Sequence, residues 1–146
     1  MIPLLALIVV FLLARFLGVL GVSYLAIWQH CLRIAVAAMF LLTASAHWGR
    51  RRPDLVRMVP PIFPKPEPLI TLTGIAEITG AVGILWEPTA RLASAGLAVL
   101  LLVLFPANVY AARHHLMIDG RPVPGLAVRT VLQVVFIAAV VVAGWC

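Results

Sequence analysis

Five long apolar segments alternate with short polar stretches along this chain. They cover residues 2–22, 28–48, 68–86, 89–112 and 125–145, and each is close to the roughly 20 residues that a helix needs to cross a bilayer. The segments are continuously apolar, whereas membrane β-strands alternate apolar and polar residues. The pattern therefore predicts an all-α membrane helical bundle, with a single transmembrane domain over residues 1–146.

The first segment has a second interpretation, as a cleaved secretory signal peptide. No basic residue precedes its apolar run, and the sequence SYLA that follows it is a poor cleavage site. We therefore expect residues 2–22 to be retained and to span the membrane as an extra N-terminal helix.

The third segment contains a carboxylate, Glu77, at its centre. On a helical wheel, one face is an apolar stripe and the opposite face is small and polar. A face of the second kind favours close helix packing, so Glu77 should point into the bundle. An unpaired carboxylate there costs roughly 3 kcal/mol on insertion scales, so it must be protonated, paired or hydrogen-bonded. The stripe consists of Ile75, Ile78, Val82 and Leu85, and the opposite face of Thr73, Gly74, Glu77, Gly80 and Ala81.

Depth along the helices selects candidate partners for Glu77. At a rise of ~1.5 Å per residue, Glu77 lies about 14 Å from the inner end of its helix, Gln133 about 12 Å, and Asn108 and Arg129 about 6 Å. Arg129 and Gln133 are four residues apart and share a helix face. We expect Glu77 to be coupled to Arg129, directly or through Gln133. The whole predicted polar intramembrane cluster consists of Glu77, Arg129, Gln133, Asn108, His47 and Arg15.

Members of this cluster also have purely structural interpretations. Asn108 follows Pro106 in the sequence FPANVY, and this proline deprives the Leu102 carbonyl of its helical partner, so Asn108 is expected to satisfy freed backbone. His47 lies near the inner boundary, where an interfacial hydrogen bond is favoured over contact with a quinone or a metal. For Glu77, an ion pair that locks helices together is favoured over proton or quinone chemistry.

Composition agrees with a membrane protein, and charge adds an orientation. Hydrophobic residues make up 64% of the chain and charged residues 11%, against about 25% charged residues in soluble domains. The net charge of +6 is concentrated in the stretches at 49–67 and 113–124. Such clusters set membrane orientation and contact anionic lipid, and no nucleic acid partner is expected. We expect a bacterial-type inner membrane, with the N-terminus cytoplasmic and the C-terminus outside.

The stretch at 49–67 is expected to be more than a linker. Residues 54–59 are predicted to form one turn of helix in the membrane interface. Prolines at 60, 61, 64, 66 and 68 then predict an extended path.

The chain lacks the usual metal and cofactor motifs. Its two cysteines, Cys31 and Cys146, form no CxxC pattern, and its histidines have no HExxH spacing. It also has no flavin, haem or iron–sulfur motif, so redox chemistry would need a partner to carry electrons. We expect no bound metal, and we leave open both enzymatic activity and a bound quinone.

Six short motifs follow one another in a specific order. They are TASAHW (43–48), MVPPIFP (58–64), TGIAEITGAVGIL (73–85), RLASAGL (91–97), FPANVYAA (105–112) and RxxxQxxFI (129–137). Over roughly residues 33–140, this order resembles the DoxX-like family of small four-helix membrane proteins. That family commonly has Gly and Phe beside the histidine, where this chain has Ala44 and Trp48. The resemblance implies a four-helix DoxX-like core, here preceded by the extra helix with Arg15.

The resemblance implies a membrane protein that works with others. Family members are associated with the small subunit of a thiosulfate:quinone oxidoreductase and with methylamine-utilisation accessory proteins, and eukaryotic relatives resemble membrane assembly factors. The favoured hypothesis is an accessory or assembly subunit of a membrane complex, in contact with lipid and with a membrane-protein partner or a second copy. The alternatives are a quinone-interacting oxidoreductase subunit, and a small transporter or proton path, which the lack of an evident inverted repeat weakens.

Overall fold

Five helices of at least 18 residues occupy the five apolar segments. The structure, a computed structural model, describes residues 2–145. The elements in chain order are α1 (Ile2–Val19), α2 (Ser23–Ala26), α3 (Trp28–Ser45), α4 (Arg52–Met58), α5 (Pro66–Leu85), α6 (Glu87–Arg113), β1 (Met117–Ile118), β2 (Arg121–Pro122) and α7 (Leu126–Trp145).

Four of these helices, within residues 2–145, are long and apolar enough to cross a membrane. They are α1, α5, α6 and α7, and their length and composition indicate that this all-α chain is a membrane protein. The remaining predicted span, at residues 28–48, forms α3. This helix is less apolar because Gln29, His30 and Arg33 lie in its first two turns. It packs against α1, α5 and α7, so its neighbours cover much of its surface.

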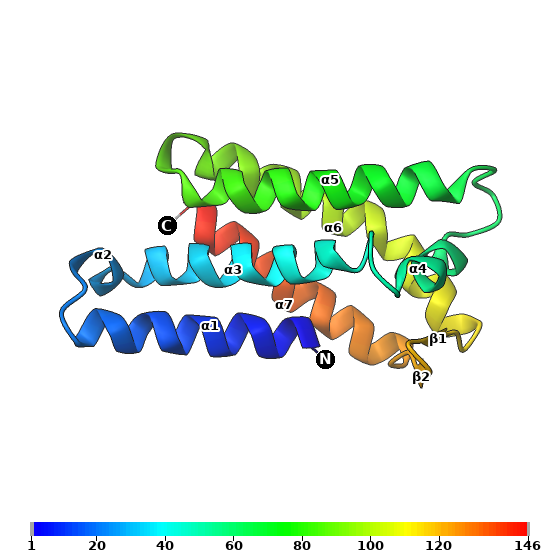
Figure 1. Cartoon of the computed structure of the whole chain (residues 1–146), viewed down its shortest axis with the longest axis horizontal. Helices are drawn as coiled ribbons and strands as arrows, with labels where there is room; N and C mark the ends of the chain where they lie inside the picture. Colours follow the sequence, from blue (N-terminus) through cyan, green and yellow to red (C-terminus); the bar gives the residue numbers. More distant parts are fainter. Residues whose placement is uncertain (1, 146) are drawn as a thin grey trace.

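The long helices form a four-helix ring with one helix outside it (Figure 1). Around the ring, α3 packs on α5, α5 on α6, α6 on α7, and α7 on α3. The N-terminal helix α1 lies along the outer side of α3. This arrangement agrees with the expected bundle of four helices plus one added N-terminal helix.

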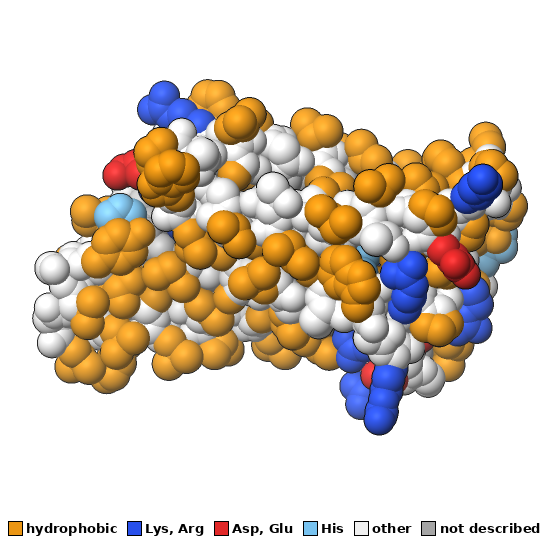
Figure 2. All heavy atoms as spheres, turned by 45° about the horizontal axis from the view of Figure 1, so that its top comes forward, with side chains coloured by type: hydrophobic (Ala, Val, Ile, Leu, Met, Phe, Trp, Pro, Cys, Tyr) orange, Lys and Arg blue, Asp and Glu red, His pale blue; other side chains and the backbone are white. Residues whose placement is uncertain are grey.

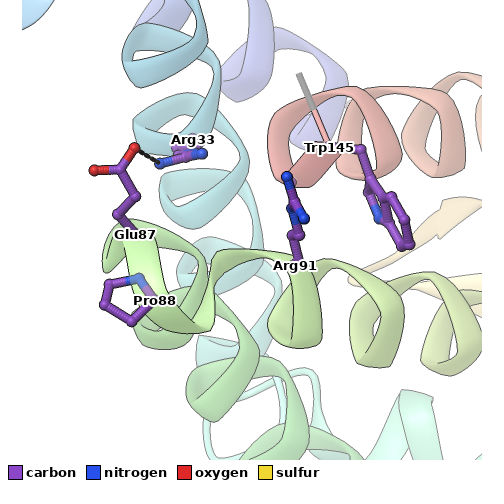
Figure 3. A pocket seen from close by; sticks show the side chains of 6 residues that line it. Arg33, Glu87, Pro88, Arg91 and Trp145 are labelled. Atoms are coloured by element: carbon purple, nitrogen blue, oxygen red, sulfur yellow. Dashed lines mark ion pairs between the residues drawn. The ribbon is translucent and has the colours of Figure 1, made fainter.

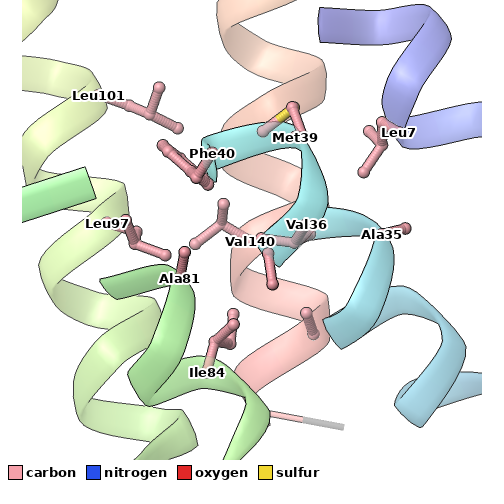
Figure 4. Close-up of a cluster of buried hydrophobic side chains, with 12 residues drawn as sticks. Leu7, Ala35, Val36, Met39, Phe40, Ala81, Ile84, Leu97, Leu101 and Val140 are labelled. Atoms are coloured by element: carbon pink, nitrogen blue, oxygen red, sulfur yellow. The ribbon is translucent and has the colours of Figure 1, made fainter. Parts of the chain in front are cut away.

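The core of the ring contains side chains from all four of its helices (Figure 4). Small residues let the helices approach one another: a Cβ on Gly80 would lie 2.4 Å from the Leu97 side chain. Leu7 of α1 joins the same core from outside the ring. The fully buried large side chains of the ring include Val36, Met39, Ile84, Leu97 and Val140.

The surface along the bundle is apolar, and charged side chains gather at its ends (Figure 2). The predicted stripe on α5 is exposed, with Ile75 at 50% and Val82 at 59%. On the opposite face of α5, Glu77 and Ala81 are buried. The expected division of this helix into an outward apolar face and an inward small, polar face is confirmed.

At one end of the bundle, α4 packs against the small hairpin formed by β1 and β2. Asp119 and Gly120 both have positive φ in the hairpin turn, and Asp-Gly is a favoured pair for a two-residue hairpin turn. The Asp119 N–H donates to Asp54 at 2.8 Å, and Arg51 forms an ion pair with Asp119 at 3.3 Å. These contacts join the two basic stretches, which are far apart in sequence.

The stretch between α4 and α5 differs partly from its prediction. The expected turn of helix is present as α4, which begins at Arg52 and ends at Met58 and so starts two residues before the predicted turn. Pro66 and Pro68 do not continue an extended path, because both lie in the first turn of α5. Proline is well tolerated there, since the first helical N–H groups have no partner within the helix.

Candidate functional site

Glu77 lies on α5 and points toward the end of α3 and the turn that follows it. Its Oε2 accepts a hydrogen bond from the Thr43 hydroxyl at 2.7 Å. Its Oε1 lies 3.4 Å from Nε2 of His47. Glu77 is 5% exposed and His47 is 6% exposed. We call Glu77, His47 and Thr43 the Glu77 cluster, in which each carboxylate oxygen has a partner from the α3 side.

The hydrogen bonds of His47 fix how many protons this cluster holds. Nδ1 of His47 lies 2.6 Å from the carbonyl oxygen of Ile70. A carbonyl can only accept, so Nδ1 carries a proton. An unprotonated Nε2 would face the Glu77 carboxylate with a lone pair, so the contact requires one more proton, on the imidazole or on the carboxyl group. Either arrangement has zero net charge, which lowers the cost of burying the pair.

The close approach of the His47 turn to α5 depends on Gly74. A Cβ at this position would lie 2.9 Å from the Cβ of His47 and 2.7 Å from the ring of Trp48. Gly74 is one helical turn before Glu77, so the sequence TGIAE supplies both the space for the turn and the carboxylate that the histidine contacts. Gly74 and Glu77 therefore act together, because the glycine allows the close approach of His47 and the glutamate contacts it.

Arg52, in the first turn of α4, holds the other side of the same turn. Its Nη1 donates to the His47 carbonyl at 2.7 Å, and its Nη2 donates to the Thr71 hydroxyl at 3.0 Å. The guanidinium thus connects the backbone of the turn to the start of α5. From the sequence alone, Arg52 is predicted only to be a basic residue that sets orientation. Its position five residues after His47 is the one feature of the sequence that could have indicated a contact with the His47 turn.

The expected coupling of Glu77 to Arg129 is not present in the structure. Arg129 on α7 donates to Oδ1 of Asn108 on α6, and within residues 2–145 it forms no ion pair. Glu77 faces α3, and α5 and α7 occupy opposite positions in the ring. Equal depth therefore did not imply contact, because depth says nothing about the lateral order of the helices.

Gln133 and Asn108 also have partners other than those expected. The Gln133 amide donates to the Leu101 carbonyl of α6, and this contact is buried. It reaches the backbone one position before Leu102, whose carbonyl Pro106 leaves without its helical partner. The side chain that contacts the α6 backbone next to Leu102 is thus that of Gln133. Asn108 instead accepts a hydrogen bond from Arg129.

Arg15 lies outside the Glu77 cluster. Its Nη1 donates to the carbonyl of Ala26 at 2.8 Å and to that of Leu25 at 3.3 Å. These are carbonyls of α2, and Arg15 is near the end of α1, on the outer side of α3. The expected inclusion of Arg15 in one cluster with Glu77 is therefore wrong.

A family model covers most of this arrangement. The model described as Domain of unknown function (DUF8561) matches residues 36–143. The chain belongs to this family. No curated protein and no solved structure matches the chain. The DUF8561 match begins within α3 and ends within α7, so it includes the Glu77 cluster and most of the ring, and it excludes α1.

Buried and half-buried polar side chains in the DUF8561 region form contacts between helices. Glu77 joins α5 to the end of α3, Arg129 and Gln133 join α7 to α6, and the Ser94 hydroxyl joins α6 to the Val140 carbonyl of α7 at 2.8 Å. Such contacts can fix the register of helices in a bundle. The Glu77 cluster can in addition hold, and release, the proton between His47 and Glu77.

The described residues offer no obvious metal site. Within residues 2–145, no group of three or more His, Cys, Asp or Glu side chains gathers to hold a metal ion. Cys31 is buried against α1 and α2 with Ala14 and Leu25, and its thiol donates to the Leu25 carbonyl at 3.2 Å. Cys146 lies outside the described residues. The Glu77 cluster itself combines a titratable imidazole with a titratable carboxyl group.

Proposed function

We propose that this protein is an accessory or assembly subunit of a membrane complex that is redox- or quinone-linked. The observation that carries the proposal is the use of buried polar groups to join helices. Glu77, Arg129 and Gln133 each contact a neighbouring element within the chain. A small bundle whose helices are joined by these contacts is suited to present a fixed shape to a partner.

The resemblance to DoxX-like proteins supports the same proposal. It covers roughly residues 33–140 and implies a four-helix core, and DoxX-like proteins are associated with the small subunit of a thiosulfate:quinone oxidoreductase and with methylamine-utilisation accessory proteins. The DUF8561 match spans nearly the same part of the chain. The partner would be another membrane protein or a second copy of this chain, bound through the apolar outer surface within the bilayer.

We propose that the basic end of the bundle faces the cytoplasm of a bacterial-type inner membrane. The ends of α3 and α6, the start of α5 and the hairpin meet there, together with most of the loop arginines. Basic loops are retained on the cytoplasmic side during insertion. The N-terminus would then be cytoplasmic, and the C-terminus would lie outside after five crossings.

The main alternative is a quinone-interacting subunit, and the Glu77 cluster is the observation that favours it. Nε2 of His47 lies 3.4 Å from the Glu77 carboxylate near one end of the bundle, and quinone reduction requires both a hydrogen-bond donor and a proton source. In this alternative, the quinone would accept from His47 or Glu77, and a partner would supply the electrons. A small transporter or proton path is the third possibility.

Affinity purification in a mild detergent, followed by mass spectrometry of proteins and lipids, tests these functions. An accessory subunit is expected to retain a defined membrane-protein partner, and Glu77→Gln should keep that partner because glutamine can still accept from Thr43. A quinone-interacting subunit is expected to retain quinone that is lost in Glu77→Gln. A monomer that retains neither a partner nor quinone would contradict both proposals.

A further inference from the structure

The end of the bundle opposite the basic loops contains a hollow with two arginines in its wall (Figure 3). Its volume is about 390 Å³, and it lies where the ends of α3, α6 and α7 meet. The lining residues are Arg33, Glu87, Pro88, Arg91, Gly144 and Trp145. From this hollow we infer a binding site for a phosphate group, carried by an anionic phospholipid headgroup.

Arg33 is the buried anchor of this site. Its side chain is 8% exposed, and its Nε donates to the Ala143 carbonyl in the last turn of α7 at 2.9 Å. Within residues 2–145, this is the one hydrogen bond that its guanidinium makes. A buried guanidinium with most of its N–H groups unused is costly unless an anion compensates it. The fixed Nε contact leaves the remaining N–H groups available for such an anion.

Glu87 compensates Arg33 only weakly. The distance from Nη1 of Arg33 to Oε1 of Glu87 is 4.0 Å, and the Glu87 side chain is 81% exposed. An ion pair at this separation, with one partner in solvent, contributes little. Arg91 lies one helical turn after Glu87 on α6 and lines the same hollow. Among residues 2–145, the side chains that line the hollow include two guanidinium groups and one carboxylate, so their summed charge is positive.

The level of the hollow in the molecule favours a lipid headgroup as the occupant. The exposed tryptophans Trp28, Trp86 and Trp145 lie at this end of the bundle, and exposed tryptophans mark the headgroup level of a bilayer. Guanidinium groups match the geometry of phosphate oxygens. Arg33 and Arg91 would contact the phosphate, while Trp145 would lie beside the glycerol part of the lipid.

Gly144 keeps the hollow in shape at its α7 side. A Cβ on Gly144 would lie 2.2 Å from the Ser94 Cβ and 3.0 Å from the Ala90 carbonyl oxygen. The end of α7 therefore rests directly on α6, which places Trp145 and the Arg33 partner Ala143 beside Arg91. This arrangement does not depend on the Glu77 cluster, so the inference is independent of the proposed function.

Native mass spectrometry of the full chain in detergent, titrated with phosphatidylglycerol or phosphatidylcholine, tests the site. The wild type is expected to retain one tightly bound phosphatidylglycerol in preference to phosphatidylcholine. Arg91→Gln should lower this retention at least fivefold. The control Arg121→Gln removes one exposed positive charge from the opposite end of the bundle and should leave it unchanged. Arg91 is exposed, so this variant should fold even where Arg33→Gln does not.

Lipid retention in Glu87→Gln distinguishes a binding site from an Arg33–Glu87 ion pair that has only a structural role. Loss of the competing carboxylate should increase retention of phosphatidylglycerol, whereas loss of a structural pair would not. Competition by inorganic phosphate, with no lipid retained, would assign the same site to free phosphate instead of a lipid. Equal retention of both lipids, or unchanged retention in Arg91→Gln, would overturn the inference.

Discussion

At the residue scale, the Glu77 cluster shows how a carboxylate is tolerated inside a membrane bundle. Thr43 donates to one oxygen, and Nε2 of His47 lies 3.4 Å from the other. The Ile70 carbonyl fixes the proton on Nδ1 of His47. Because the pair is neutral overall, the bundle buries two polar side chains without burying a net charge. The stability of the bundle should therefore depend on both partners together.

A double-mutant cycle should reveal this dependence. Glu77→Ala and His47→Ala should each lower the free energy of unfolding by about 1–3 kcal/mol, because each leaves a buried polar group unpaired. The double variant should be less destabilised than the sum, by about 0.5–3 kcal/mol. Unfolding in mixed detergent micelles measures all three. The control pair is Glu77→Ala with Arg129→Ala, which share no contact and should be additive within about 0.5 kcal/mol. Coupling in the control pair, and none with His47, would contradict this geometry.

Gly74 supports a second prediction at this scale. Gly74→Ala should lower the free energy of unfolding by about 1–3 kcal/mol, because the new methyl group overlaps His47 and Trp48. The matched control is Gly96→Ala on α6, where a Cβ meets no atom within 4 Å. That change should be neutral or stabilising by up to about 1 kcal/mol, since alanine is the better helix former. Equal effects of the two substitutions in the same unfolding assay would refute the role of Gly74.

The sequence predicted the direction of Glu77 but not its partner. The helical wheel placed Glu77 on the small, polar face of its segment, and that face is the buried face of α5. Its partner was sought among residues of equal depth, which selected Arg129. Depth follows from the rise of a helix, whereas lateral neighbours follow from the order of helices around the ring. The order of helices around the ring cannot be derived from the apolar pattern of a single sequence.

At the element scale, α4 and the β1–β2 hairpin form a joint that the charge pattern did not predict. Asp54 accepts from the Asp119 N–H at 2.8 Å and also contacts Arg57. The Asp119 N–H, with Arg57 beside it, holds the pKa of the Asp54 carboxyl below its ordinary value. The contact therefore stabilises the joint while Asp54 is ionised, which is the case at neutral pH.

Acidification should open this joint. A carboxyl whose pKa is lowered by folding contributes stability above its ordinary pKa, and that contribution disappears as the pH falls through the lowered value. Hydrogen exchange at the Asp119 amide should thus be faster, after correction for the intrinsic rate, below about pH 4. Asp54→Ala removes the acceptor and should weaken protection already at neutral pH, and Arg121→Gln serves as a control on the same hairpin. Protection that is unchanged in Asp54→Ala would rule out the joint.

The ends of the helices were less predictable than their centres. Long apolar runs locate a spanning helix well, because nothing else satisfies the backbone in lipid. Prolines beside such a run are ambiguous, since they interrupt a helix interior but fit its first turn. Pro66 and Pro68 are therefore in α5, although their local sequence also fits an extended linker.

At the scale of the whole molecule, the five helices separate into a ring and an addition. Hydropathy predicted all five spans alike, but in the structure α3 packs against three other long helices, α1, α5 and α7. Its polar residues reduce its apolar character, and they are used there: Arg33 contacts α7, and Thr43 contacts α5. A central helix can be less apolar than its neighbours because it faces protein on several sides rather than lipid.

Charge summed over the whole molecule predicts an orientation for this bundle. The structure brings the two basic stretches together at one end through Arg51, Asp54 and Asp119, so their charges act at one membrane surface. The opposite end has Arg33 and Arg91 within the hollow, and Arg15 bound to backbone carbonyls. Because arginines and lysines next to spanning helices resist translocation, the basic end should remain cytoplasmic.

Cysteine labelling in intact cells with a permeable outer layer measures this orientation. In a Cys146→Ser background, Ile62→Cys places a thiol at the basic end, where the side chain is 81% exposed, and Val22→Cys places one at the opposite end, where it is 45% exposed. A membrane-impermeant maleimide should label Val22→Cys at once and Ile62→Cys only after the inner membrane is broken. Cys31 is fully buried and should stay unlabelled in the background chain. The reverse order of labelling would mean that the charges of the basic end do not set the orientation, and would place the Glu77 cluster in the outer half of the membrane.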